Sequence, residues 1–370
     1  MQCKSARSVR CFCVFTSKMS ASVASLTGAL KWKRNLHWPY TVLLLMTFLG
    51  FLFYLAWPIL LDQSIEGEKE MAQNNIAFVL QLTAGTNPSK SRFVYRLKQC
   101  LGSICQHSSI SLTIHLFANS VGKDEALKIF EEIGHYCVSG YKVKFYDVEE
   151  VIEGIQPAVD VIKDAIQIGG RSNTKMPLYY LPIFMDSILP EDVTRVILMD
   201  ADFFFYSDIK LLFDHFDNFK NTTIFGLAYV QLPTYREVFQ KYRQEHPGTK
   251  IGDPPPDGVT GYNGGLSMLH LSNMRKSKHY KQILLNNEVR KYAEKYQFRS
   301  TRAEQDFFVL LDAEHHDELF YVVPCQWNRQ LCKRTSPALE YRNCPKPIHA
   351  YHGNCHVKMP TLDNPSQFTD

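Results

Sequence analysis

Acidic residues are absent from the first 39 positions of the chain, although this segment holds seven basic residues. They are Lys4, Arg7, Arg10, Lys18, Lys31, Lys33 and Arg34. The whole chain has a net charge of +4, so without these seven positive charges the remaining residues carry a net charge of −3. Proteins that bind nucleic acids need dense positive charge to meet the phosphates, and this body lacks it. We therefore expect no nucleic acid among the partners of the protein.

Charged residues are also absent from residues 40–61, a run of 22 mostly apolar positions. A helix of that length, at about 1.5 Å per residue, spans the hydrocarbon core of a membrane. A cleaved signal peptide is the alternative, but it would have a shorter apolar region and a small-residue cleavage site, which is not evident after Leu61. Because positively charged flanks stay in the cytosol, we expect a single-pass type II membrane protein. Its parts would be a cytosolic tail at 1–39, a membrane helix at 40–61, a stem at 62–74 and a lumenal catalytic domain at 75–370.

Cysteine pairs with C-x-x-C spacing are absent, which favours disulfides over a structural zinc site in the C-terminal region. Seven cysteines follow the apolar run, namely Cys100, Cys105, Cys137, Cys325, Cys332, Cys344 and Cys355. Spacing does not fix the connectivity, but the density of the last four leads us to expect the bridges Cys325–Cys332 and Cys344–Cys355. An odd number leaves at least one thiol without a partner in the chain. Asn221, in the sequence Asn-Thr-Thr, is a candidate glycosylation site of a lumenal protein.

Apolar strand-like segments alternate with amphipathic segments through most of the lumenal part. The expected strands are 76–82, 111–117, 141–146, 195–199, 223–228, 262–269 and 319–323. The expected helices are 93–104, 124–137, 148–168, 179–189, 209–216, 236–245, 276–298 and 304–312. This alternation predicts an α/β fold with a doubly wound, mostly parallel sheet. The proline- and glycine-rich residues 246–261 predict a long loop, and residues 324–370 predict irregular structure.

Two aspartates follow the buried strand expected at 195–199. Asp200 and Asp202 are two residues apart, so both carboxylates point to the same side of an extended chain. Open α/β sheets bind their ligands beyond the carboxyl ends of the strands. Carboxylate oxygens suit Mn²⁺ or Mg²⁺, which in turn hold diphosphate groups. The pattern favours a metal site here, and the alternative is a turn cap beside a solvated carboxylate.

Further ligands would be needed to complete such a site. Three histidines lie near the C-terminus, namely His349, His352 and His356. A neutral imidazole often joins carboxylates on Mn²⁺, although a backbone hydrogen bond is the common alternative for any one histidine. Asn263 precedes two glycines and would either present its amide to a sugar or lie in a β-bulge. Gln305 and Asp306 would either face the cleft or cap a helix.

A resemblance to a known family rests on four strings. They are Asp200-Ala201-Asp202, Tyr262-Asn263-Gly264-Gly265, Glu304-Gln305-Asp306-Phe307-Phe308 and His352-Gly353. With them the chain resembles glycosyltransferase family 8, whose members are retaining enzymes of the GT-A (Rossmann-like) fold that use a UDP-sugar and Mn²⁺. Longer strings lie at 239–247, 252–258, 325–332 and 351–355. These resemble the branch of the family that adds an outer α-1,3-linked xylose to a xylosyl-glucose disaccharide on EGF-like repeats, notably in Notch.

The resemblance implies that Asp200, Asp202 and His352 bind Mn²⁺, with Mg²⁺ as the alternative, and that the donor is UDP-xylose. The residues that it places at the donor or acceptor are Leu82, Thr83, Ala84, Asp200, Ala201, Asn263, Gly264, Gln305, Trp327, Asn328, Gly353 and Asn354. Catalytic roles would fall to Asn263, Gln305 and Asp306. We expect same-face attack supported by Gln305, with a covalent intermediate on Asp306 as the alternative.

The chain departs from the family pattern at Gly264, where serine is usual, and in the tail, where His352 directly precedes Gly353. The resemblance implies residence in the membrane of the endoplasmic reticulum, with the Golgi as the alternative, and it leaves a homodimer open. The rival functions are a glucoside xylosyltransferase or another family 8 transferase. A non-catalytic sugar-binding protein or a metal phosphohydrolase built on the same aspartates are the rivals from other classes.

Overall fold

The computed structural model describes most of the chain after the first 72 residues. The described ranges are 73–83, 91–166, 176–285, 287–332 and 339–367. The expected cytosolic tail (1–39), the expected membrane helix (40–61) and nearly all of the stem lie outside these ranges, as does Ala84. Within them, no helix is both long and apolar enough to cross a membrane.

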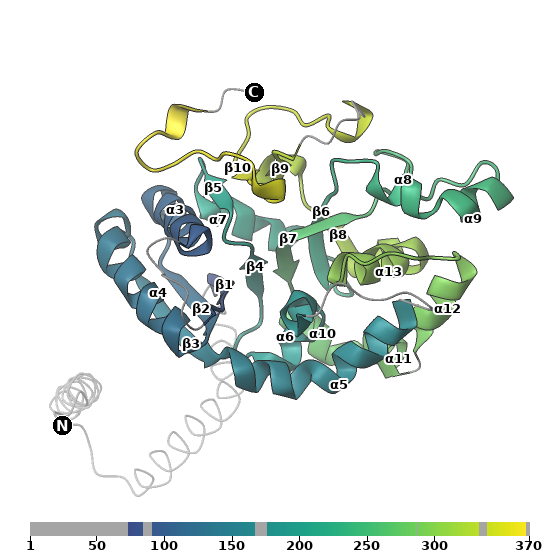
Figure 1. The fold of residues 1–370 in the computed structure, drawn as a ribbon, viewed down its shortest axis with the longest axis horizontal. Coiled ribbons are helices and arrows are strands. Elements are labelled where there is room, and N and C mark those ends of the chain that lie inside the picture. The colour runs from purple at the N-terminus through teal and green to yellow at the C-terminus, as the bar shows by residue number, and fades with distance from the viewer. Residues whose placement is uncertain (1–72, 84–90, 167–175, 286, 333–338, 368–370) are drawn as a thin grey trace, which may run out of the picture. The chain divides into compact units, whose positions relative to one another are not determined.

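A seven-stranded sheet with the order β3-β2-β1-β4-β7-β6-β8 forms the centre of the described residues (Figure 1). Its strands are β1 (Asn75–Leu80), β2 (Leu112–Ala118), β3 (Tyr141–Asp147), β4 (Val196–Met199), β6 (Phe225–Tyr229), β7 (Tyr262–Leu269) and β8 (Phe320–Val322). The pairs from β3 to β4 are parallel, as is β6 with β8, whereas β7 runs antiparallel to both of its neighbours. The expectation of a doubly wound, mostly parallel sheet is confirmed.

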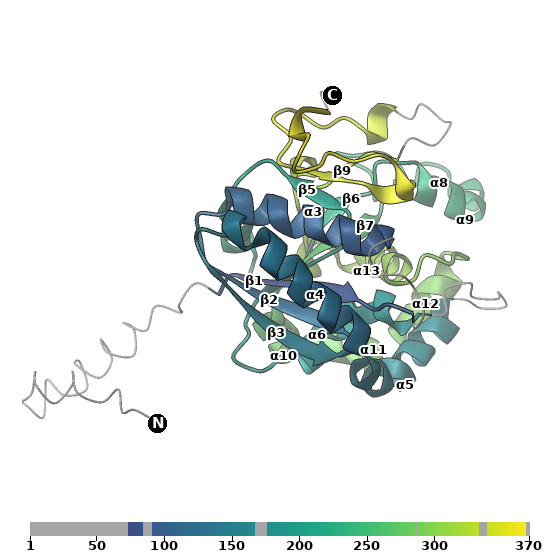
Figure 2. The ribbon, with the colours of Figure 1, turned by 60° about the vertical axis from the view of Figure 1, so that its left-hand side comes forward.

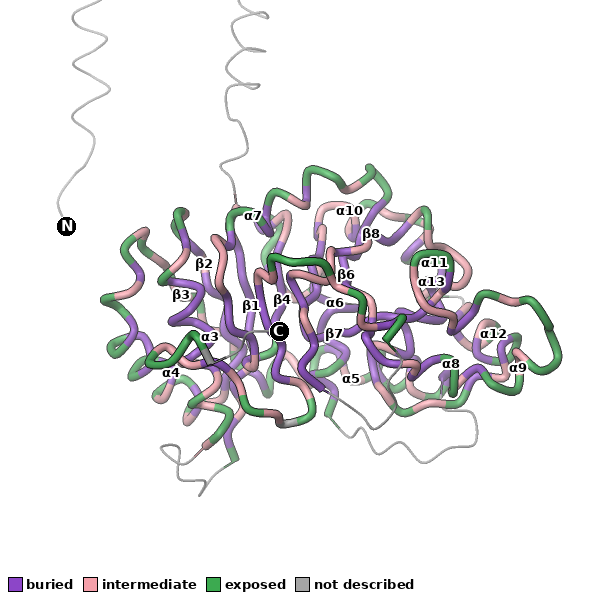
Figure 3. Tube along the Cα trace, turned by 90° about the horizontal axis from the view of Figure 1, so that it is seen from above, coloured by how far each residue is buried: buried purple, intermediate pink, exposed green. Residues whose placement is uncertain are grey.

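Helices cover both faces of this sheet (Figure 2). They are α3 (Arg92–His107), α4 (Ser120–Ile133), α5 (Val148–Ile166), α6 (Leu181–Ile188), α7 (Ile209–Phe213), α8 (Thr234–Val238), α9 (Gln240–Glu245), α10 (Leu271–Lys276), α11 (Lys278–Leu285), α12 (Glu288–Lys295) and α13 (Glu304–Leu319). Successive side chains of β1 alternate between the two faces. Ile76, Phe78 and Leu80 pack in one apolar core with α3, α4 and α7, while Ala77 packs in a second core with α5, α6 and α10 to α13. Figure 3 shows buried strands between helices whose outer sides are exposed.

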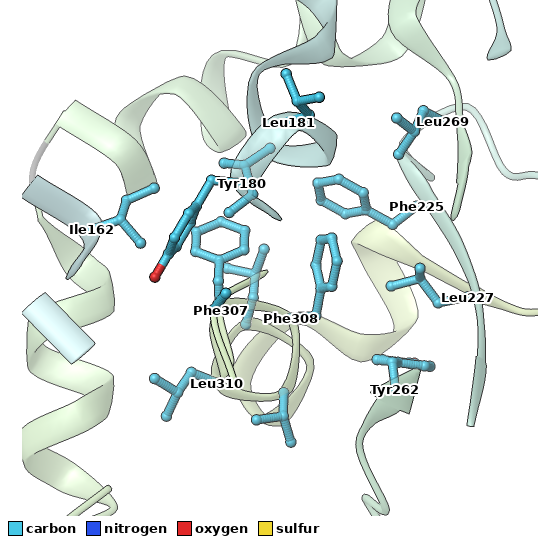
Figure 4. Close-up of a cluster of buried hydrophobic side chains, with 14 of the residues drawn as sticks. Ile162, Tyr180, Leu181, Phe225, Leu227, Tyr262, Leu269, Phe307, Phe308 and Leu310 are labelled. Carbon is cyan, nitrogen blue, oxygen red and sulfur yellow. The ribbon is translucent and has the colours of Figure 1, made fainter. Parts of the chain in front are cut away.

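The second core fixes the start of α13 at the carboxyl end of the sheet. Phe307 and Phe308 point from this helix toward Tyr180, Leu181 and Phe225 (Figure 4). The rings of Phe225 and Phe308 are 5.1 Å apart in an edge-on arrangement. Because these side chains are fully or almost fully buried, the three residues that begin α13 are held against the strand ends.

A second, three-stranded sheet ties the C-terminal region to the residues after β4. Its order is β5-β10-β9, with β5 at Phe203–Phe205, β9 at Arg329–Gln330 and β10 at Ala350–His352. The prediction that residues 324–370 are irregular is therefore wrong for β9 and β10. Strands of two or three residues are too short to show a periodic pattern in the sequence, so only the pairing identifies them.

The predicted cysteine pairing is wrong, although all four cysteines do form disulfides. The bridges are Cys325–Cys344 and Cys332–Cys355. The parallel pairing of β9 with β10 explains the second bridge, because Gln330 lies opposite His352 and the chains continue side by side to Cys332 and Cys355. A third disulfide, Cys105–Cys137, joins the end of α3 to the segment after α4. Among the cysteines that the structure describes, Cys100 is the one free thiol, and it is buried.

Peptide mapping under non-reducing conditions tests this connectivity. We expect linked peptides for Cys325–Cys344, Cys332–Cys355 and Cys105–Cys137, with Cys100 alkylated only after unfolding. Replacement of both Cys332 and Cys355 by Ser should lower the free energy of unfolding by about 2–5 kcal/mol, since a lost disulfide frees the unfolded chain. Recovery of a Cys325–Cys332 peptide would contradict the structure.

Candidate active site

Asp200, Asp202 and His352 converge at the carboxyl end of β4. One ligand atom from each lies within 4.8 Å of the others. Nε2 of His352 is 3.2 Å from Oδ1 of Asp202 and 3.6 Å from Oδ2 of Asp200. The pairing of β10 with β5 produces this geometry, because it places His352 opposite Phe203. The structure thus brings together the three residues that the sequence resemblance assigns to a metal.

The imidazole of His352 is held by a chain of polar side chains. Its Nδ1 lies 3.1 Å from Oδ1 of Asn328, whose amide nitrogen donates to Oδ1 of Asn263 at 2.9 Å. The same Asn263 oxygen accepts from the backbone N–H of Gly265 at 3.2 Å. The ring of Phe203 stacks on the imidazole at 4.4 Å. A hydrogen bond at one ring nitrogen fixes the tautomer and leaves the other, Nε2, for a metal ion.

Charge at this site is balanced by a partly buried cation. Nη1 of Arg96, on α3, lies 2.7 Å from Oδ2 of Asp202. Burial raises the pKa of Asp202, but His352 and Arg96 outweigh burial and lower this pKa below its ordinary value. Burial lowers the pKa of His352, but hydrogen bonds to Asp200 and Asp202 outweigh it and raise this pKa to about 9. Asp202 is thereby kept ionised and oriented.

Gly265 borders the space between His352 and Asp200, and its lack of a side chain keeps this space open. A Cβ at this position would collide with Cε1 of His352 and would lie 2.8 Å from its Nε2 and 2.9 Å from Oδ2 of Asp200. Two carboxylates and one imidazole suit Mn²⁺ and related divalent cations. The donor set and the open space that Gly265 preserves therefore fit a divalent metal.

A pocket of about 430 Å³ adjoins the candidate metal ligands at Asp200. Its lining includes Leu82 and Thr83 from the end of β1, Asp200 and Ala201 after β4, and Gly264 from β7, and it also includes Met176, Tyr179 and Glu304. Five of the residues predicted to contact the substrates thus line one cavity, and Asp200 of the Asp pair is among them. A volume of this size is typical of small-molecule sites.

Glu304, the first residue of α13, is a wall of the pocket that sequence reasoning did not single out. Its side chain is buried, and among the residues that the structure describes its Oε2 has no hydrogen-bond partner. Burial raises its pKa well above the ordinary value, and nearby Asp200 adds to the shift. A Cβ on Gly264 would collide with Oε1 of Glu304. This contact gives a physical reason for glycine where the family usually has serine.

Gln305 and Asp306 follow Glu304 but differ in their surroundings. Gln305 is half-buried, and its Cγ lies 3.3 Å from the position of a Cβ on Gly264. Asp306 is fully buried and accepts hydrogen bonds from the backbone N–H of Arg302 at 2.7 Å and from the hydroxyl of Tyr235 at 3.2 Å. Burial raises the pKa of Asp306 to about 6. Asp306 therefore braces the turn before α13.

Other predicted site residues contact the protein itself. Trp327 is buried, donates from Nε1 to His215 and stacks on His349. Oδ1 of Asn354 accepts from the backbone N–H of Cys332, and the N–H of Gly353 donates to the backbone oxygen of Asp202 at 2.7 Å. Nδ1 of His349 forms a hydrogen bond with the hydroxyl of Ser207, 2.8 Å away. The side chain of His356 lies outside the described part of the chain. Asn221 is exposed in a turn before β6, as a glycosylation acceptor must be.

Comparison with known proteins identifies the family. The crystal structure of mouse xyloside xylosyltransferase 1, in its apo form, matches with a TM-score of 0.70 and 30% identity, over 78% of this chain and 100% of that chain. The chain belongs to the xyloside xylosyltransferase family. Its fold is accordingly of the GT-A glycosyltransferase type, and the resemblance of the sequence to a xylosyltransferase is confirmed.

Curated sequences agree with the structural match. Xyloside xylosyltransferase 1 of Mus musculus and of Homo sapiens are each 33% identical to this chain over 260 residues, which is 67% of this chain. The matched region spans 65% of the full length of each of these relatives. No family model matches the chain.

Three residues of this family member's site escaped the sequence prediction. Arg96 lies on a helix far from the Asp pair in sequence, and its ion pair with Asp202 has no local signal. The sequence pattern at Gly265 indicates only a glycine-containing turn or β-bulge. Glu304 opens the Glu-Gln-Asp string, and an acidic residue at the first turn of a helix is ordinarily explained by the helix dipole. Each role depends on a contact between distant segments.

Substitution of Gly265 by alanine tests the metal site. We expect the affinity for Mn²⁺ to fall by at least about 10-fold, because the methyl group would occupy space between His352 and Asp200. Titration followed by electron paramagnetic resonance measures it. Gly154→Ala on α5 is the matched control, since its new Cβ would meet no atom within 4 Å. Equal Mn²⁺ affinity in the Gly265 variant and the wild type would contradict the assignment.

Proposed function

We propose that this protein transfers xylose from UDP-xylose, with retention, onto the xylose of a xylosyl-glucose O-glycan on EGF-like repeats of the Notch type. The observation that carries the proposal is the convergence of Asp200, Asp202 and His352 beside a 430 Å³ pocket. The names of the relatives support xylose as the transferred sugar. The donor set supports a metal-bound diphosphate as the leaving group.

Asp200, Asp202 and His352 would hold Mn²⁺, with Mg²⁺ as the alternative. When bound, the cation supplies Lewis-acid stabilisation of the negative charge that develops on the leaving diphosphate. The protein contributes a preset geometry. Asn328 orients the imidazole of His352, and Arg96 keeps Asp202 ionised before the donor arrives.

The pocket residues divide between the two ends of the donor. Leu82 and Thr83, at the end of β1, would contact the uridine, together with Ala84 from the same predicted segment. Glu304 would receive a hydroxyl group of the sugar, because its Oε2 is buried and has no hydrogen-bond partner in the part of the chain that is described. A bound hydroxyl would relieve the cost of that unpaired polar atom.

Retention at the anomeric carbon is best explained by same-face attack. A covalent intermediate would need a carboxylate that faces the sugar, whereas both oxygens of Asp306 are directed to Arg302 and Tyr235. The departing phosphate would accept the proton of the attacking hydroxyl. Gln305 would support the positive charge on the sugar ring with its amide oxygen. Asn263 would act indirectly, through Asn328 and His352.

The disulfides and the apolar run at 40–61 support a place in the secretory pathway. Three disulfides among the described residues favour an oxidising lumen. Together with the apolar run at 40–61, they support a type II protein of the endoplasmic reticulum, with the Golgi as the alternative. The acceptor, an EGF-like repeat, would meet the enzyme there.

Replacement of Asp306 by asparagine separates the two retaining mechanisms. Loss of a covalent nucleophile costs up to about a millionfold in turnover. We expect a loss below about 100-fold for Asp306→Asn, because asparagine keeps an oxygen that can accept the N–H of Arg302. Turnover of UDP-xylose in the steady state measures it. If turnover fell by about a millionfold in a variant that keeps the wild-type melting temperature, same-face attack would be contradicted.

Transfer to defined acceptors tests the function itself. With UDP-xylose and Mn²⁺, we expect product on an EGF repeat that carries xylosyl-glucose and none on the same repeat with glucose alone. Mass spectrometry of the repeat measures the added pentose, and Asp200→Asn is the inactive control. Product on the glucose-only repeat alone would instead indicate a glucoside xylosyltransferase. Tight, Mn²⁺-dependent UDP binding without transfer to any acceptor would indicate a non-catalytic binding protein.

A further inference from the structure

Two histidines and a glutamate form a second cluster of metal-ligating side chains, at the opposite end of α13 from Glu304. His279 is on α11, and His315 and Glu318 are on α13. One ligand atom from each lies within 4.8 Å of the others. Nδ1 of His279 is 2.7 Å from Oε1 of Glu318, and the two imidazole rings are 4.7 Å apart and nearly perpendicular. The helices α11, α12 and α13 lie together on one side of the sheet (Figure 1).

The neighbouring groups leave these three side chains facing one another. Glu314 accepts hydrogen bonds from Lys295 and Tyr296, and Glu288 accepts one from Lys291. Those two carboxylates are therefore satisfied elsewhere. Glu318 is the carboxylate that meets the histidine pair.

The orientation of His315 is set by a hydroxyl group behind it. Nε2 of His315 lies 2.8 Å from the hydroxyl of Tyr292, on α12. This hydrogen bond leaves Nδ1 as the nitrogen that can bind an ion. Metal-bound histidines commonly make such a bond with their second ring nitrogen, which fixes the ring.

We propose that His279, His315 and Glu318 bind a zinc ion that fastens α11 to α13. Two imidazoles and one carboxylate are a known ligand set for Zn²⁺, with water as the fourth ligand. The side chains of His279 and Glu318 are 39% and 43% exposed, so solvent can reach the fourth position. Small movements of the side chains would place the three ligand atoms at about 2.0–2.2 Å from a central zinc ion.

The role of this ion is structural and separate from sugar transfer. The first turn of α13 carries Glu304 and Gln305, whereas His315 and Glu318 lie in its last turns. An ion that binds the folded state alone raises its stability by mass action. The zinc ion thus stabilises the helix that supplies one wall of the donor pocket, without contact to the reacting groups.

Calorimetric titration of the full-length protein with zinc chloride tests the site. The background carries Asp200→Asn and Asp202→Asn, so that the first metal site does not contribute. We expect one bound Zn²⁺ and a rise in melting temperature. Both should be lost in His279→Ala and His315→Ala, and Tyr292→Phe should weaken Zn²⁺ binding by about 10-fold. His135→Ala, at an exposed histidine before Cys137, should bind Zn²⁺ like the background.

A spectroscopic measurement and a milder variant complete the test. Co²⁺ in place of Zn²⁺ should give the intense visible absorption of a four-coordinate site in the background and not in Glu318→Gln, which keeps the size of the side chain. If the alanine variants do not fold, the Glu318→Gln comparison decides. Absence of Zn²⁺ binding in the background, or equal binding in the Glu318→Gln and His135→Ala proteins, would overturn the proposal.

Discussion

The antiparallel pairing of β10 with β5 is the constraint on which the candidate active site depends. It places His352, from the C-terminal region, opposite Phe203, one residue after Asp202. The N–H of Gly353 then donates to the backbone oxygen of Asp202, which secures the same register. The disulfide Cys332–Cys355 joins the residues that follow β9 to those that follow β10. The candidate metal ligands, which come from two distant segments, are thus held in place by backbone hydrogen bonds.

Helix α13 provides the second fixed element of the site. Phe307 and Phe308 anchor its first turns in the larger apolar core, so Glu304 and Gln305 keep their place at the pocket. Asp306 completes this support through the N–H of Arg302. An active site stabilises the charge that develops in the transition state most strongly when its polar groups are already in place, because little reorganisation is then needed during the reaction.

The sequence predicts the sheet well and the site only in part. β1 and β4 contain continuous apolar runs, and the spacing of Asp200 and Asp202 indicates a shared direction. His352 could not be chosen over its neighbouring histidines from composition, and only the family resemblance selected it. The predicted disulfide pairing is wrong. The bridge Cys332–Cys355 follows from the register of β9 and β10, and these two strands are too short to show a periodic pattern in the sequence. Arg96 and Glu304 act through contacts between segments, which a single sequence does not record.

A network of side chains orients His352 to bind a metal ion, and the substitution Asn328→Leu tests this inference. Asn328 would not touch the metal, but it holds Nδ1 of His352 and bonds to Asn263. Leucine is close in size and cannot make either bond. We predict that the affinity for Mn²⁺ in the presence of UDP, measured by electron paramagnetic resonance, falls by about 10–100-fold. Unchanged Mn²⁺ affinity in a folded Asn328→Leu protein would contradict the account.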